Sequence, residues 1–299
     1  MLYIIDGTGP DDDQIYARQM NGSMCEKLAK DYNGHYNRGP SLLGTETFKI
    51  AQHVFQSIGR DPELRRQPLF LAGHSRGGAA VIRIAQLLKE QRIGVEALFL
   101  FDAVDRTGPG ENVQHIPGNV KSTYHARRDK IIVNYFEYGA RETTRKYMEC
   151  AAKSSNPQSC EGLRKIAEKY RRLDDAMKLR MRFSYGYFDG IGINFDNCGT
   201  GKDTSANNST YEEKFFLGSH GAIGGSFLGA QDGAWDKPSD SAFFEQIRNS
   251  DRAAVASVSA WMKEKFDATK LELHGNVRSE PPPQALLSAN IPIPRFKGK

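Results

Sequence analysis

The sequence lacks any long hydrophobic run, and this absence excludes a chain built on membrane-spanning helices. Of its 299 residues 39% are hydrophobic, and no apolar stretch reaches the ~18 residues that a transmembrane helix needs. It has only four cysteines, none of them in a close Cys-x-x-Cys pair, so no zinc site is expected. Its 41 basic and 36 acidic residues leave a net charge of +5, which is too slight to indicate a nucleic-acid partner. The 16 Phe and 12 Tyr are enough for a buried core, so the chain is expected to fold.

The first residues are typical of a strand rather than of a targeting segment. Leu2 to Ile5 is a short apolar run closed by a turn at Asp6 and Gly7, without the basic segment and longer apolar stretch of a signal peptide. We therefore expect no signal peptide: the protein is made in the cytoplasm, and any export uses a route without a cleaved signal. The sequence contains no internal repeat, and we expect one domain over residues 1–299.

Short apolar runs alternate with amphipathic segments, which predicts an α/β fold. Buried strands are predicted at 2–5, 69–72 and 97–101, with helices at 13–30, 45–58 and 77–90 between them. This alternation implies parallel strands joined by right-handed crossovers. Later in the chain the pattern predicts strands at 120–124, 131–136 and 215–217, a loop at 196–212, and helices at 240–249 and 251–265. Residues 141–182 are predicted to form a helical cap insertion, and 276–299 an extended proline-rich tail.

The strongest chemical signal is Gly73-His74-Ser75-Arg76-Gly77, which lies between a predicted strand and a predicted helix. This is the context that a Gly-x-Ser-x-Gly nucleophile elbow requires. The turn strains the backbone of the serine, and side chains two residues before and after it would collide there. The sequence therefore predicts Ser75 as a nucleophile at the N-terminus of a helix, whose positive dipole end favours an oxyanion.

A serine nucleophile needs a base and an acid that orients the base. Asp102 directly follows the next buried strand, so it is expected at the same edge of the sheet as Ser75. Asp105, three residues further on, is the alternative acid. The chain order Ser, Asp, His of an α/β-hydrolase is satisfied by two of the seven histidines, His125 and His220, and position alone does not separate them. A base of ordinary pKa would lose activity below about pH 6.

Two backbone N–H groups are expected to hold the oxyanion. One belongs to Arg76, the residue after the nucleophile. The other is expected from the glycine-rich turn after the first strand, at Gly7 or Thr8. Chemistry of this kind needs neither a metal nor an organic cofactor.

Seven short segments, taken in order, resemble motifs of the DUF2235 family, the Tle1-like lipases of type VI secretion. Ile5-Asp6-Gly7-Thr8 resembles the opening F-x-D-G-T of that family, and the Ser75 elbow resembles its G-F-S-R-G-A. The other similar segments are 35–45, 101–104, 125–129, 216–225 and 261–262. One departure is Ala222, which stands where the family has an aspartate two residues after its catalytic histidine.

The resemblance implies an α/β-hydrolase with a triad of Ser75, Asp102 and His220, and so favours His220 over His125. It implies a phospholipase A that acts on membrane glycerophospholipids. It also implies an antibacterial effector exported to a target-cell periplasm, with an immunity protein and a secretion-spike protein as partners. The alternatives are a soluble esterase or thioesterase of the same fold, and a non-catalytic binding module on a hydrolase fold.

Two features within the predicted cap lead to further expectations. Cys150 and Cys160 flank the turn between its helices, so a bridge between them and two separate thiols are equally compatible with the sequence. Residues 160–182 carry eight basic and four acidic residues opposite an apolar stripe. A basic amphipathic helix of this kind can lie on anionic lipid as a lid, although a solvated surface helix has the same pattern.

Overall fold

The computed structural model describes residues 1–41, 44–62, 67–105, 112–128, 145–153, 157–165, 167–168, 197–202, 210–225 and 241–275. The predicted strand at 131–136 and the tail at 276–299 lie outside these residues. So do residues 169–182, the larger part of the predicted lid helix.

The core of the molecule is a parallel six-stranded sheet with the order β2-β1-β3-β4-β6-β8. Its strands are β1 (Leu2–Ile5), β2 (His35–Asn37), β3 (Phe70–His74), β4 (Val95–Phe101), β6 (Val120–Arg128) and β8 (Thr210–Phe216). A second, two-stranded sheet pairs β5 (His115–Ile116) with β7 (Gly201–Lys202). Because β1 lies between β2 and β3, the chain reverses its direction across the sheet between β1 and β3. In open α/β sheets ligands bind at the carboxyl ends of the strands at such a switch point.

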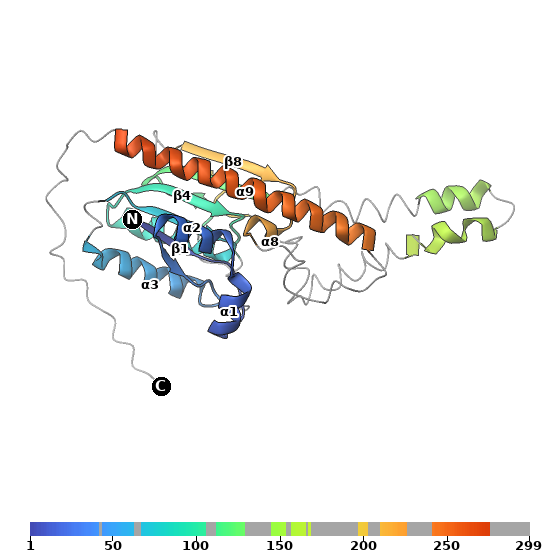
Figure 1. Cartoon of the computed structure of the whole chain (residues 1–299), viewed down its shortest axis with the longest axis horizontal. Helices are drawn as coiled ribbons and strands as arrows, with labels where there is room; N and C mark the ends of the chain where they lie inside the picture. Colours follow the sequence, from blue (N-terminus) through green and yellow to red (C-terminus); the bar gives the residue numbers. More distant parts are fainter. Residues whose placement is uncertain are drawn as a thin grey trace.

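Helices cover both faces of this sheet. The helices that cover them are α2 (Met24–Tyr32), α3 (Thr47–Arg60), α4 (Arg76–Glu90), α8 (His220–Ile223) and α9 (Ser241–Gly275), while α1 (Asp13–Met20) packs its Tyr16 against the turn after β1. Residues of α3 and α4 share one buried cluster with the sheet, and residues of α2, α8 and α9 share the other. Figure 1 shows α9 running alongside β8, with α3 on the opposite side of the sheet. The fold is therefore a mostly parallel α/β sheet with helices on both faces, as predicted.

The two clusters follow from the alternation of side chains along each strand. On β4, Leu98 and Leu100 belong to the cluster beneath α4, whereas Phe99 and Phe101 belong to the cluster beneath α9. All four are buried, as expected for a parallel strand covered on both faces.

Four predicted elements differ from the structure. The helix predicted at 13–30 is two helices, because Gly22 has a φ of 82° and the Ser23 hydroxyl accepts a hydrogen bond from Glu26 N and so caps α2. The two helices predicted at 240–249 and 251–265 are one, α9. At the predicted junction Asp251 is buried and accepts hydrogen bonds from Ser219 within the continuous helix. The loop predicted at 196–212 contains β7 and the start of β8, and within it Cys198 is buried.

The described part of the cap consists of helical residues 145–153, 161–165 and 167–168 around a 3-10 turn at Pro157–Cys160. Figure 1 shows these two green helices side by side, away from the sheet. A disulfide joins Cys150 to Cys160 with an S–S distance of 2.10 Å, which decides between the two alternatives that the sequence left open.

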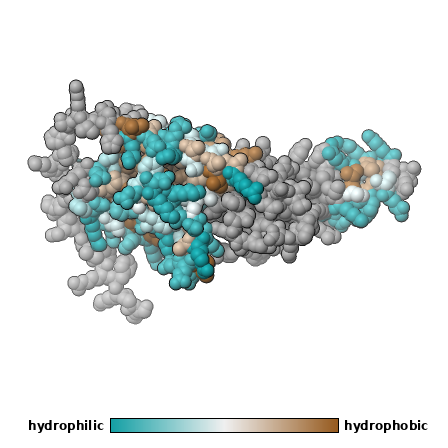
Figure 2. Space-filling model, in the orientation of Figure 1, coloured by the Kyte–Doolittle hydropathy of each residue, from teal (hydrophilic) through white to brown (hydrophobic). Residues whose placement is uncertain are grey.

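No described helix combines the length and the apolar character that crossing a bilayer requires. Within the described ranges there is also no group of three or more His, Cys, Asp or Glu that could hold a metal ion. Figure 2 shows that the described surface on this side is mainly hydrophilic, with apolar residues in small groups.

Candidate active site

Ser75 occupies a strained turn between β3 and α4. Its φ of 55° and ψ of −126° are rare for a residue other than glycine. The glycines on either side are required by close backbone contacts. A Cβ on Gly73 would lie 2.4 Å from Gly77 O, and a Cβ on Gly77 would lie 2.3 Å from the carbonyl oxygens of Ile5 and Asp6. The turn therefore has the geometry of a nucleophile elbow, with the serine hydroxyl presented at the end of the sheet.

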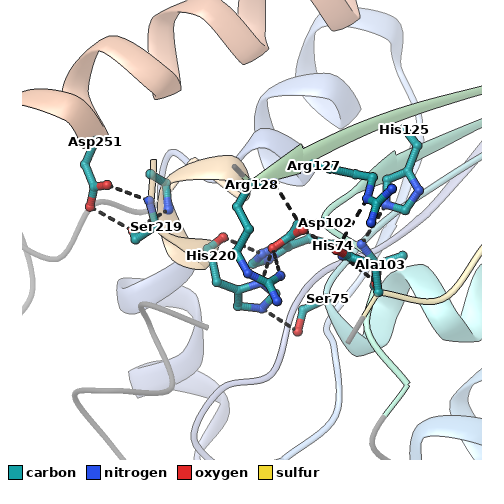
Figure 3. A network of polar contacts seen from close by, with 12 residues as sticks. His74, Ser75, Asp102, Ala103, His125, Arg127, Arg128, Ser219, His220 and Asp251 are labelled. Atoms are coloured by element: carbon teal, nitrogen blue, oxygen red, sulfur yellow. Dashed lines mark hydrogen bonds and ion pairs between the residues drawn. The ribbon is translucent and has the colours of Figure 1, made fainter. Parts of the chain in front are cut away.

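The structure brings Ser75, His220 and Asp102 into one hydrogen-bonded chain (Figure 3). His220 Nε2 lies 2.8 Å from Ser75 Oγ, and His220 Nδ1 lies 2.7 Å from Asp102 Oδ2. Since the carboxylate can only accept, Nδ1–H donates to Asp102 and the serine hydroxyl donates to Nε2. All three residues are buried.

Three elements meet at one edge of the sheet to build this chain. Ser75 follows β3, Asp102 follows β4, and His220 begins α8 shortly after β8. These are carboxyl ends of parallel strands, and β3 lies beside the switch point described above. The position of the site thus follows from the topology.

Asp102 is fully buried and receives four hydrogen bonds. Its Oδ2 accepts from His220 Nδ1 and from Arg128 Nη1, and its Oδ1 accepts from Asn197 Nδ2 at 2.7 Å and from Arg128 N at 3.3 Å. Burial alone would raise the pKa of this carboxyl group. The hydrogen bond from His220 and the charge of Arg128 outweigh burial and hold the pKa well below its usual range. Asp102 is therefore ionised at neutral pH.

The pKa of His220 is lowered to about 4, first because the ring is buried. The hydrogen bond to Asp102 acts in the opposite direction, and the nearby His74 and Arg128 add to the lowering. The ring is thus neutral, as a general base must be, well below the limit of about pH 6 expected for an ordinary histidine.

His125, the alternative base, does not contact Ser75. Its Nε2 accepts a hydrogen bond from Ala103 N at 3.1 Å, so its Nδ1–H donates to Gly199 O at 3.2 Å. It thereby fixes the turn in which Asp102 has a φ of 47°. Burial lowers the pKa of His125 to about 4. The alternative acid, Asp105, is likewise not the carboxylate that contacts His220.

The turn after β1 is held by a second buried carboxylate, that of Asp6. Gly7 N donates to Asp6 Oδ1 at 2.7 Å, while Ser23 Oγ and Tyr36 OH donate to Oδ2 at 2.5 and 2.9 Å. The N–H group of Gly7 is therefore already used, which leaves Thr8 as the better candidate for the second oxyanion donor. Arg76 N lies in the first turn of α4, where N–H groups point out of the helix.

Several residues that support the site were missed by sequence reasoning. Asp251 on α9 accepts hydrogen bonds from Ser219 N at 2.7 Å and from Ser219 Oγ at 2.8 Å, directly before His220 (Figure 3). His74 Nε2 lies 3.3 Å from His220 O. Arg128 and Asn197 were also missed as partners of Asp102. His74 is next to Ser75 in sequence, but nothing in the sequence indicates its contact with His220. Arg128 lies within the 125–129 segment, whereas Asn197 and Asp251 belong to segments in which no sequence signal indicates a role at the site.

No protein-family model matches the chain, and no curated protein matches it. Among solved structures it is similar to a YdeN-like hydrolase of Pectobacterium atrosepticum, with 15% identity, a TM-score of 0.28 and 43% of this chain covered. It spans 64% of that protein, just under two thirds. It is also similar to a hydrolase of the alpha/beta superfamily from Xanthomonas campestris, with 16% identity, a TM-score of 0.27, and 58% and 98% of the two chains covered. The third is the RedJ thioesterase of prodiginine biosynthesis in Streptomyces coelicolor, with 11% identity, a TM-score of 0.31, and 83% and 86% covered.

These likenesses are too distant to carry an assignment. The α/β-hydrolase-like fold follows instead from the parallel sheet, from the helices on both its faces and from the strand–Ser75–helix turn. Nothing in the comparisons relates the chain to the Tle1-like lipases in particular.

Proposed function

We propose that the protein is a serine hydrolase that cleaves carboxylic esters through an acyl-enzyme on Ser75. The single observation that supports this most is the chain of hydrogen bonds from Ser75 through His220 to Asp102. These three side chains come from separate parts of the sequence, and their contacts match the roles of nucleophile, base and orienting acid.

The first step is acylation of Ser75. His220 Nε2 takes the hydroxyl proton as Oγ attacks the carbonyl carbon, and Asp102 stabilises the imidazolium that forms. The N–H groups of Arg76 and Thr8 hold the oxyanion. His220 then gives the proton to the leaving alcohol. In the second step His220 takes a proton from the water that attacks the acyl-enzyme and gives it to Ser75 Oγ, which leaves as the carboxylic acid is released.

We further propose that the substrates are membrane glycerophospholipids and that the protein is an antibacterial effector exported by type VI secretion. The sequence resemblance to the Tle1-like lipases is the main support. Phe215 and Leu217, which are 49% and 50% exposed, precede His220 closely in the sequence and offer exposed apolar surface. The disulfide fits a protein that works in an oxidising compartment such as a periplasm.

Defined vesicles test this proposal. Vesicles of phosphatidylglycerol and phosphatidylethanolamine with different acyl chains at the two positions would be incubated with the protein, and the products identified by mass spectrometry. We expect fatty acid and lysophospholipid from the native protein, and a loss of about 10⁴-fold or more for Ser75→Ala.

A soluble short-chain nitrophenyl ester separates the alternatives. Cleavage of this ester without cleavage of vesicles would replace the phospholipase by a soluble esterase. If the folded protein cleaves neither substrate, the hydrolase proposal is wrong and a non-catalytic module takes its place.

A further inference from the structure

A buried arginine shares the acid of the candidate triad. Arg128 ends β6, next to the end of β4 where Asp102 lies, and is only 3% exposed. Its guanidinium donates to the same Asp102 oxygen, Oδ2, that accepts from His220 Nδ1. Its backbone N–H donates to the other oxygen, Oδ1. Arg128 thus holds both oxygens of the carboxylate.

Such a cation changes the charge balance of the triad. In a triad without it, the negative charge of the aspartate favours the protonated histidine. Here the guanidinium of Arg128 already neutralises the negative charge of Asp102, since an arginine side chain does not lose its proton in proteins. The attraction that would stabilise a charged His220 is reduced, and the site excludes most of the water that would screen the arginine.

The other ionisable groups around His220 come from four elements. His74 on β3 has its ring 5.0 Å from that of His220, and Asp6, after β1, lies 3.9 Å from His74 Nδ1 on its far side. Asp102 follows β4. On α9, Asp251 holds Ser219 rather than His220. Of these groups, Arg128 is the permanent cation that shares an oxygen with His220.

We propose that Arg128 is a positioning residue that clamps Asp102 and keeps His220 uncharged in acid, so that the site works well below neutral pH. The inference rests on the proposed role of His220 as base. Burial of the His220 ring is the first cause of the low acid limit, and the clamp on Asp102 adds a second cause that a triad without the arginine lacks.

The test is the pH dependence of the rate at which a fluorophosphonate probe modifies Ser75, followed between pH 3.5 and 8. For the native protein we expect the rate to fall with a midpoint near the pKa of His220, about 4. In Arg128→Gln, Asp102 is no longer compensated, so the midpoint should rise by about one pH unit or more.

Two matched variants separate charge from structure. Arg128→Lys keeps the charge and should keep the midpoint low, although the lost fork geometry should slow the reaction. Lys121→Gln removes a cation at the start of the same strand, which pairs with Glu96, and should leave both the midpoint and the rate unchanged. An unshifted midpoint in Arg128→Gln, or an equal shift in Arg128→Lys, would overturn the proposal.

A second measurement is independent of reactivity and of whether Arg128→Gln folds. In Ser75→Ala, with Arg128 in place, the His220 imidazole should remain neutral at pH 5 by NMR. Titration of His220 at pH 6.5 or above would contradict the inference. Failure of the native protein to react with the probe at any pH would instead contradict the proposed function. The same NMR titration in Ser75→Ala/Arg128→Lys and Ser75→Ala/Arg128→Gln would then test the role of Arg128, with a raised His220 midpoint expected only for the glutamine variant.

Discussion

Replacing His125 by glutamine should make the stability of the protein less sensitive to acid. His125 is fully buried, and burial lowers the pKa of its ring to about 4. In the unfolded chain the same ring has a pKa of about 6.5. Above pH 6.5 the ring is neutral in both states, so titration of His125 contributes nothing to the free energy of unfolding.

As the pH falls below 6.5, the unfolded chain binds a proton that the folded protein does not. The folded state therefore loses stability until the pH passes the folded pKa near 4. At pH 4 the loss due to His125 amounts to about 3 kcal/mol. His74 and His220 also have lowered pKa values, but they are present in both proteins and cancel in the comparison.

The assay is urea unfolding of the native protein and of His125→Gln at pH 7 and pH 4. At pH 7 the variant should be less stable by about 1–3 kcal/mol, because Ala103 N or Gly199 O loses its partner. At pH 4 this gap should shrink by about 3 kcal/mol, since glutamine does not titrate. A gap that is the same at both pH values would show that His125 is not held neutral, and would refute the reasoning.

Three other predictions concern separate parts of the molecule. Asp251→Asn should slow ester hydrolysis and lower stability by about 1.5–3 kcal/mol, because Ser219 loses a charged acceptor, whereas Glu264→Gln on the exposed side of α9 should change neither. Thiol titration of the oxidised protein in denaturant should find two thiols, those of Cys25 and Cys198, and a count of four would contradict the disulfide. If the 160–182 segment engages lipid, then charge reversal at Arg171 and Arg172 should weaken hydrolysis of anionic vesicles, most at low salt, but leave cleavage of a soluble ester unchanged. Equal loss on both substrates would assign the segment a structural role instead.

The parts of the site that depend on local geometry could be predicted from the sequence. The elbow at Ser75 needs glycines at fixed positions between a strand and a helix, so its pattern is contiguous. Asp102 was predicted because the ends of neighbouring parallel strands share one edge of the sheet.

The choice between His125 and His220 depended on longer-range structure. His220 follows β8, and His125 lies within the neighbouring strand β6. The ring of His125 accepts a hydrogen bond from Ala103 N and so lies away from Ser75. His220 reaches Ser75 because α9 holds the preceding Ser219 through Asp251. Arg128 and Asn197 meet Asp102 only through the packing of distant segments, and no spacing in the sequence indicates that meeting.

The central claim is that Ser75 is a nucleophile activated by His220, and covalent labelling tests it most directly. The native protein would be treated with a fluorophosphonate probe, digested and analysed by mass spectrometry. We predict one adduct, located on Ser75, with no adduct in Ser75→Ala and labelling slowed by orders of magnitude in His220→Ala but not in His125→Ala. An adduct that persists in Ser75→Ala, or a native protein that is folded and remains unlabelled, would contradict the account.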